Sequence, residues 1–165
     1  MAPLTLLAAQ KVANLLTTGD VLSNEIQSLS SANNIIVPPI STSQVILSSV
    51  DPNLGDDNVQ LTYPRICIYP WTVKNTKAEK FRSFSGTVAV VAEIWASGNL
   101  VQQIDEWIHF YVEAYTLLLR ENTGDWKDGM FFSGIYDVQF QSPKAGGLGF
   151  VESAKVTCVL NVSLN

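Results

Sequence analysis

Residues 100–121 read LVQQIDEWIHFYVEAYTLLLRE, and the rest of the chain can be interpreted around this stretch. Its apolar residues recur at steps of three and four, as on one face of an α-helix: Leu100, Ile104, Trp107, Ile108, Tyr111, Tyr115 and Leu118. Polar residues repeat with the same period on the other face. We therefore expect an amphipathic helix that is capped by Asn99 and ended by residues 122–124. A helix of this length, roughly 33 Å, needs a sheet against which to bury its apolar face.

Four runs with a two-residue alternation would supply that sheet: 65–69, 87–96, 131–141 and 153–164. One polar face per strand predicts a mostly antiparallel sheet that the long helix covers on one side. The fold class is therefore predicted to be α+β. We expect residues 1–165 to form a single domain, because 165 residues with 47% hydrophobic and 15% charged content can bury a sizeable core.

The first third of the chain divides into helices and an irregular arm. Apolar spacing over residues 4–16 and 21–29 predicts N-terminal helices with a pause near 17–19, and Asp20 is a candidate cap for the second helix. Residues 31–60 are broken up by prolines, so we expect an extended, partly exposed arm in which 35–37 and 45–47 could form short strands.

Composition excludes several classes of protein. The net charge of −5 counts against a dedicated nucleic-acid-binding surface. Cys67 and Cys158 lie in strand-like runs and form no C-x-x-C motif, which predicts buried, reduced thiols. The start of the chain lacks a basic region before its apolar run, so it is interpreted as a helix rather than a signal peptide. No run reaches the ~18 apolar residues of a membrane span, which predicts a soluble protein.

Sequence motifs for catalysis or metal binding have simpler interpretations. His109 is the only histidine and falls on the polar stripe of the helix. Asp105 and Glu106 are adjacent, so their side chains diverge by about 100° on a helix and cannot act as a paired acid and base. Residues 51–58 resemble a calcium loop but have a misplaced glycine, and residues 146–149 lack the following helix that a phosphate loop needs. We predict no catalytic group, no metal site and no cofactor.

Two loops are candidate interaction sites. Residues 70–83 join the first two clear strands, and four of the ten basic residues of the chain lie between 74 and 82. A solvated charge run explains this cluster, and so does an electrostatic contact with an acidic neighbour. Residues 141–149 form a second flexible loop between the last two strands. The candidate protein-interface residues are Lys74, Lys77, Lys80, Arg82, Lys144 and Leu148.

The order of the elements carries a resemblance to a known family. Residues 63–69 read YPRICIY, and a basic loop, a long strand ending in Ile94-Trp95-Ala96, a helix centred on 104–107 and two closing strands follow. Over about residues 60–165, this order resembles the tail terminator proteins of long-tailed bacteriophages. Residues 31–58 look like an extension of that plan.

The resemblance implies a non-enzymatic virion protein that is made in the bacterial cytoplasm. Family members typically form a ring of six on the head-proximal end of the tail tube, where they stop tube growth and join the head. The implied partners are further copies of the chain, the tail tube protein and a head-completion or connector protein. No membrane is involved, and DNA only passes through the lumen, where an acidic lining would avoid attraction to phosphate. We expect the loop of residues 74–82 to face the tube or a neighbouring subunit, and residues 31–58 to reach an adjacent protomer.

Three alternatives remain open at this stage. A head-closure, other neck or tail tube protein would share parts of the plan, and a tube subunit would form long open polymers instead of rings. A small soluble ligand-binding module would be a monomer with a pocket of a few hundred Å³ between helix and sheet. An enzyme with a dispersed site is the third.

Overall fold

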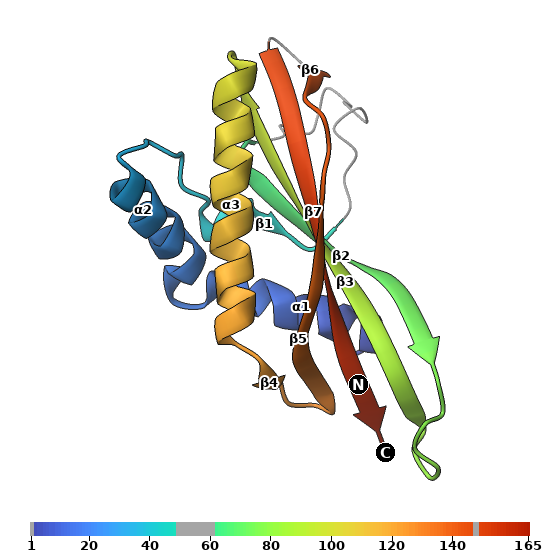
Figure 1. Cartoon of the computed structure of the whole chain (residues 1–165). Coiled ribbons are helices and arrows are strands. Elements are labelled where there is room, and N and C mark those ends of the chain that lie inside the picture. Colours follow the sequence, from blue (N-terminus) through green and yellow to red (C-terminus); the bar gives the residue numbers. More distant parts are fainter. Residues whose placement is uncertain (1, 49–61, 147–148) are drawn as a thin grey trace.

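The helix predicted over residues 100–121 is present as α3 (Val101–Glu121) and lies along one face of the sheet (Figure 1). The structure is a computed structural model and describes residues 2–48, 62–146 and 149–165. The predicted cap at Asn99 is wrong, because Leu100 occupies the N-cap position and makes no side-chain capping bond. At the other end, Asn122 Nδ2 donates a hydrogen bond to the Leu118 carbonyl over 2.8 Å and closes the last turn.

The sheet has the spatial order β1-β2-β3-β7-β5-β4, and β6 pairs with β7 beside this path. All strand pairs are antiparallel except β1 with β2, which confirms the predicted α+β fold with a mostly antiparallel sheet. The strands are β1 (Val45–Ile46), β2 (Arg65–Asn75), β3 (Phe84–Gly98), β4 (Gly124–Asp125), β5 (Met130–Phe140), β6 (Lys144–Gly146) and β7 (Gly149–Leu164).

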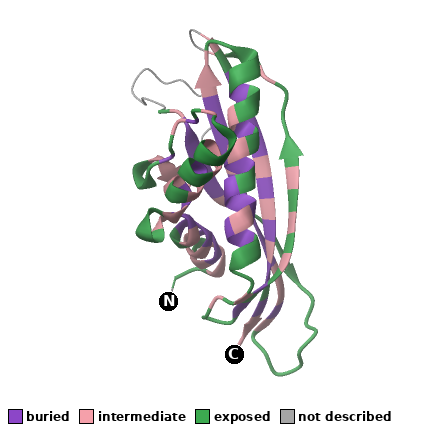
Figure 2. Cartoon of the chain, turned by 60° about the vertical axis from the view of Figure 1, so that its left-hand side comes forward, coloured by how far each residue is buried: buried purple, intermediate pink, exposed green. Residues whose placement is uncertain are grey.

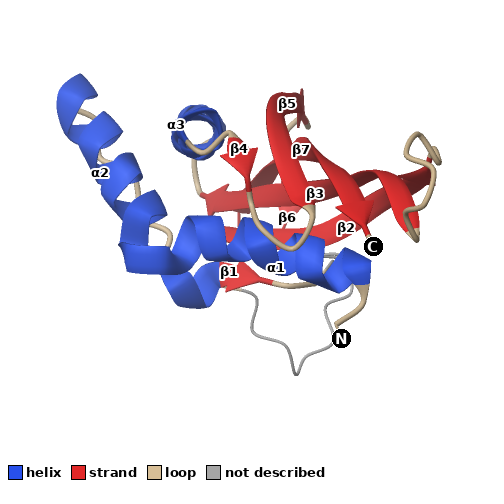
Figure 3. Ribbon diagram, turned by 90° about the horizontal axis from the view of Figure 1, so that it is seen from below, coloured by secondary structure: helices blue, strands red, loops and turns tan. Residues whose placement is uncertain are grey.

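Two N-terminal helices cover the same face of the sheet as α3 (Figure 3). They are α1 (Leu4–Thr17) and α2 (Val21–Asn33), and the predicted pause between them is the 3-10 turn η1 (Thr18–Asp20). Asp20 occupies the N-cap position of α2, as predicted, but its side chain makes no capping hydrogen bond, and its backbone is left-handed with a φ of 54°. The helix α2 also extends to Asn33, beyond the predicted end at residue 29.

The arm that follows α2 is held against α3. Residues 35–37 do not form the strand considered for them, although Val37 is buried in the core. Instead, Tyr111 Oη donates to the Pro38 carbonyl over 2.7 Å and Trp107 Nε1 donates to the Ile36 carbonyl over 3.2 Å. The 3-10 turn η2 (Thr42–Gln44) and β1 then lead back to the sheet.

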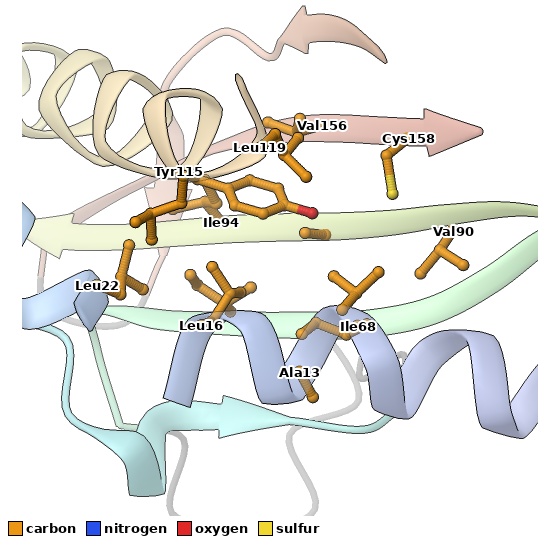
Figure 4. Packing of buried hydrophobic residues seen from close by; sticks show 14 of the residues in the cluster. Ala13, Leu16, Leu22, Ile68, Val90, Ile94, Tyr115, Leu119, Val156 and Cys158 are labelled. Atoms are coloured by element: carbon orange, nitrogen blue, oxygen red, sulfur yellow. The ribbon is translucent and has the colours of Figure 1, made fainter. Parts of the chain in front are cut away.

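The main core lies between the three helices and the sheet, where buried residues gather (Figure 2). Alternate residues of β2, β3 and β7 point into it, as the two-residue alternation in the sequence predicts. Figure 4 shows side chains from every layer meeting there: Leu16 of α1, Leu22 of α2, Ile68 of β2, Tyr115 and Leu119 of α3, and Val156 and Cys158 of β7.

The hairpin of β2 and β3 is longer than predicted. The sequence predicts a loop over residues 70–83 and a strand from residue 87, but residues 70–75 belong to β2 and residues 84–86 to β3, and the loop shortens to residues 76–83. The register shifts between Pro70 and Thr72, where the proline has no N–H to donate. Pairing resumes beyond this irregularity, so the proline displaces the strand locally without ending it.

Candidate protein–protein interface

The outer end of the β2–β3 hairpin projects beyond the body of the molecule (Figure 1). All residues from 70 to 83 are exposed, in contrast to the buried residues 65–68 of the same strand. This end carries large apolar side chains: Trp71 is 65% exposed, Val73 is 46% exposed and Phe81 is fully exposed. Aromatic side chains held in water are typical of surfaces that bury them against a partner.

The β2–β3 loop (residues 76–83) has a defined conformation that holds Phe81 outward. Phe81 and Lys77 have φ values of 70° and 48°, which is an unfavourable region for side chains of this size. The backbone is fixed from the base of the loop, because the N–H groups of Thr76 and Lys77 both donate to the Ser85 carbonyl, over 2.8 and 3.0 Å. Glu79 N–H donates to Ser85 Oγ over 3.3 Å.

The four predicted basic residues of this loop region have two different roles. Arg82 Nε is 3.1 Å from Glu79 Oε2, which also accepts a hydrogen bond from Ser163 Oγ at 2.8 Å. Ser163 and then Arg82 hold the pKa of Glu79 below its ordinary value. Arg82 also donates to Asn165 Oδ1. Arg82 therefore ties the loop to the end of β7 instead of facing outward.

The three lysines of the region are exposed and available for contacts. Lys74, Lys77 and Lys80 form no ion pair with any residue in the part of the chain that the structure describes. They lie in the same exposed segment, residues 70–83, as Trp71 and Phe81. The hairpin end thus combines an exposed apolar surface with three unpaired positive charges.

The remaining two candidates lie elsewhere. Lys144 belongs to β6, which is at the opposite end of the molecule from the β2–β3 loop (Figure 1). Its Nζ lies 5.5 Å from the centre of the Trp95 ring. Trp95, with Cys67 and Val151, forms a small buried cluster on the sheet face away from the helices. Lys144 is therefore not part of the hairpin surface, and Leu148 lies outside the described residues.

A second candidate surface, which the sequence did not indicate, is a hollow of about 620 Å³ on the helical side of the molecule. It is formed by residues between 11 and 21, at the end of α1, and by residues between 118 and 126, at the end of α3. We call it the helix-side hollow. Leu15, Val21 and Trp126 line it and are only partly buried. Its walls come from stretches far apart in the sequence, so no local motif could reveal it.

Acidic side chains border the helix-side hollow. Glu121 lines it, and Asp20 lies between its lining residues Thr18 and Val21. Neither carboxylate has an ion-pair partner among the described residues. Other charges at the hollow are already neutralised, because Lys11 Nζ lies 2.5 Å from Asp128 and Asp125 pairs with Lys127 at 3.5 Å.

A pair of carboxyl groups meets where α3 begins. Glu152 of β7 is only 2% exposed and lies against Asp105 of α3. Burial, followed by the hydrogen bond and the charge of Asp105, raises the pKa of Glu152 to about 7. The sequence could not indicate this pair, because strand and helix bring the two residues together from distant positions.

His109 is exposed and its ring centre lies 4.9 Å from that of Phe140.

The described residues contain neither a candidate metal site nor a helix that could span a membrane. No group of three or more His, Cys, Asp or Glu residues there could hold a metal ion. No helix in the same ranges is both long and apolar enough to cross a membrane. Residues 51–58, with their faint likeness to a calcium loop, fall outside the described residues.

The chain was also compared with known proteins. No protein-family model matches it, and no curated protein matches it in sequence.

Proposed function

We propose that the chain is a structural subunit of the phage tail terminator type, which assembles with copies of itself into a ring on the head-proximal end of a tail tube. The observation that carries the proposal is the projecting β2–β3 hairpin. It exposes Trp71, Phe81 and three lysines that have no ion-pair partner among the described residues, and such side chains are available to contact another molecule. The order of strands and helices also fits the plan of the family that the sequence resembles.

A ring requires each subunit to offer two different, complementary surfaces, because its contacts are heterologous. The hairpin end and the helix-side hollow differ in shape and in charge, as two complementary surfaces should. One surface projects and is basic, while the other is recessed and bordered by unpaired carboxylates. This difference supports assembly from identical copies in a head-to-tail order.

The end faces of the ring would meet the remaining partners, the tail tube protein on one side and the head-completion or connector protein on the other. DNA would pass through the lumen without being bound. The protein acts in this proposal through its shape and surface charge, and no bond is made or broken.

The ligand-binding alternative loses support from the packing of the core. It places a pocket between the long helix and the sheet, but Tyr115, Leu119 and Val156 occupy that space (Figure 4). No observation gives it an advantage over the ring.

Two measurements test the proposal. Size-exclusion chromatography with light scattering, followed by negative-stain imaging, should show discrete rings of purified protein. Added to polymerising tail tube protein, the rings should stop growth and give shorter tubes. A monomer that leaves tube length unchanged would overturn the proposal, and long tubes formed by the chain alone would favour the tube-subunit alternative.

A further inference from the structure

We propose that the β2–β3 loop of one copy docks into the helix-side hollow of the next copy, with Phe81 entering the hollow and Lys77 and Lys80 facing Glu121 and Asp20. This inference rests on the proposed self-assembly and specifies which surfaces form the contact.

One surface has a projecting apolar side chain, and the other has a hollow with a partly apolar lining. Phe81 is fully exposed and is held outward by a backbone in the left-handed region. The helix-side hollow, at about 620 Å³, is large enough for an aromatic ring and the adjoining loop backbone. Leu15, Val21 and Trp126 give it an apolar lining that is only partly buried in the isolated chain. A phenylalanine seated there would remove apolar surface from water on both copies.

The charges left unpaired on the two surfaces have opposite signs. Lys77 and Lys80 have no partner on the hairpin side, while Glu121 and Asp20 have none at the hollow, within the described ranges. Near the loop Arg82 pairs with Glu79, and at the hollow Lys11 pairs with Asp128, so these ions are neutralised within the copy. Complementary charges of this kind steer two molecules into one orientation and disfavour like-to-like contacts.

The two surfaces cannot meet within one copy. Within one copy the β2–β3 loop is fixed to the end of β7, because Ser163 Oγ donates to Glu79 Oε2 and Arg82 donates to Asn165 Oδ1, so the loop cannot reach into the hollow at the ends of α1 and α3. Docking must therefore occur between copies, and each copy uses one surface of each kind. Such a heterologous contact repeats from copy to copy and closes into a ring when the rotation permits.

Disulfide trapping between variants that each carry one added surface cysteine tests the contact directly. Ala78 lies in the loop and Thr18 lines the hollow, and both are exposed. The chain's own Cys67 and Cys158 are buried. A mixture of the Ala78→Cys and Thr18→Cys variants should form a cross-linked dimer on mild oxidation, and the double variant should form a ladder of linked copies.

The matched control replaces Thr18→Cys with Gln102→Cys, an exposed position at the other end of the molecule, in the first turn of α3. This mixture should not cross-link. Rings that assemble normally but give no link between positions 78 and 18 would overturn the docking and leave the proposed function standing. A chain that stays monomeric at all concentrations would overturn both.

A charge-exchange experiment tests the ionic part separately. Glu121→Lys should weaken association by about tenfold, and combining it with Lys80→Glu should restore most of the loss. Glu106→Lys, near the start of α3, is the control and should leave association unchanged. If Glu121→Lys and Lys80→Glu each weaken association and the combined variant associates no better than either, the proposed pairing of these residues is contradicted.

Discussion

Glu152 is an acid whose surroundings favour its protonated form. Its carboxyl group is buried beside Asp105, and this burial together with Asp105 raises its pKa from 4.5 to about 7. In the unfolded chain the group ionises near its ordinary pKa. The folded protein therefore binds more protons than the unfolded chain between these two values, and stability must fall as the pH rises through this window.

We expect Glu152→Gln to remove that dependence. A neutral amide avoids the cost of a buried charge, so the variant should be more stable than the wild type by roughly 2–3 kcal/mol at about pH 8 and almost equal to it at about pH 5. Urea denaturation at the two pH values measures the difference. Glu106→Gln, an exposed neighbour of Asp105, should change stability little at either pH. Equal effects of Glu152→Gln at both pH values would show that its carboxyl group does not titrate in this range.

The two cysteines should be unreactive in the folded protein. Both are buried and neither is in a disulfide, and burial raises the pKa of Cys158 to about 12. The thiolate is the reactive form, so a disulfide reagent at about pH 8 should label neither thiol until the chain is unfolded. Absorbance of the released thiol product, with and without denaturant, counts the reactive groups. Rapid labelling of the native protein would contradict the burial of both residues.

At the level of the elements, the projecting hairpin depends on a close approach at Gly86. This residue pairs with Asn75 near the outer end of the hairpin, and a Cβ there would collide with the backbone oxygen of Lys74. We expect Gly86→Ala to separate β2 from β3 locally, at a cost of about 1–3 kcal/mol to that segment. The buried part of the hairpin, which begins at Arg65, should stay intact.

Hydrogen exchange followed by NMR distinguishes these two parts. Amide protons of residues 72–86 should exchange at least about tenfold faster in Gly86→Ala, while those of residues 65–69 and 90–95 should be unchanged. Thr87→Ala is the control, because it removes a side chain from the adjacent position without a clash. Uniformly faster exchange across the sheet would show that the hairpin end and the core unfold as one unit.

The sequence predicts the long elements well and the short or interrupted ones poorly. Periodicity over many residues located α3 and the alternating strands, because their burial repeats regularly. Pro70 suggested the end of a strand, but β2 passes it with a shift in register. The short strands β4 and β6 have two and three residues, too few to show any alternation. The cap at Asn99 was wrong, and Asp20 stands at the predicted N-cap position without a side-chain bond, because backbone geometry at helix ends depends on how the neighbouring elements pack.

The candidate interface was only half visible in the sequence. The lysines of the hairpin could be recognised because they cluster within a short stretch. The sequence could not indicate which of these basic residues face outward. In the structure, Arg82 is neutralised by Glu79 and anchored to the end of β7. The helix-side hollow and the Asp105–Glu152 contact each join distant stretches, so they appear only once the chain has folded.

For the molecule as a whole, assembly should be sensitive to salt while folding should not. The proposed contact uses exposed charges, which are screened over about 10 Å at 0.1 M salt, whereas the fold depends on its buried core. Light scattering at constant protein concentration should show dissociation as sodium chloride rises from about 0.05 M to about 1 M, with no change in the urea midpoint.

Reversing charge on the hairpin should have the same effect as salt. The combined Lys77→Glu and Lys80→Glu variant should fold normally, assemble poorly and fail to cap tail tubes, because its loop would repel the acidic border of the neighbouring hollow. Lys144→Glu, at the opposite end of the molecule, is the matched control and should assemble like the wild type. Normal assembly and capping by the double variant would count against a role for these lysines.

The position of β7 has a consequence for how a ribosome makes this protein. β7 pairs with β3 on one side and with β5 on the other, yet it is synthesised after both. Until residues 149–164 emerge, a nascent chain holds a β2–β3 hairpin with one open edge and a β5 segment that has only β4 beside it. Open edges of this kind readily pair with other chains, so protection by chaperones matters most in this interval.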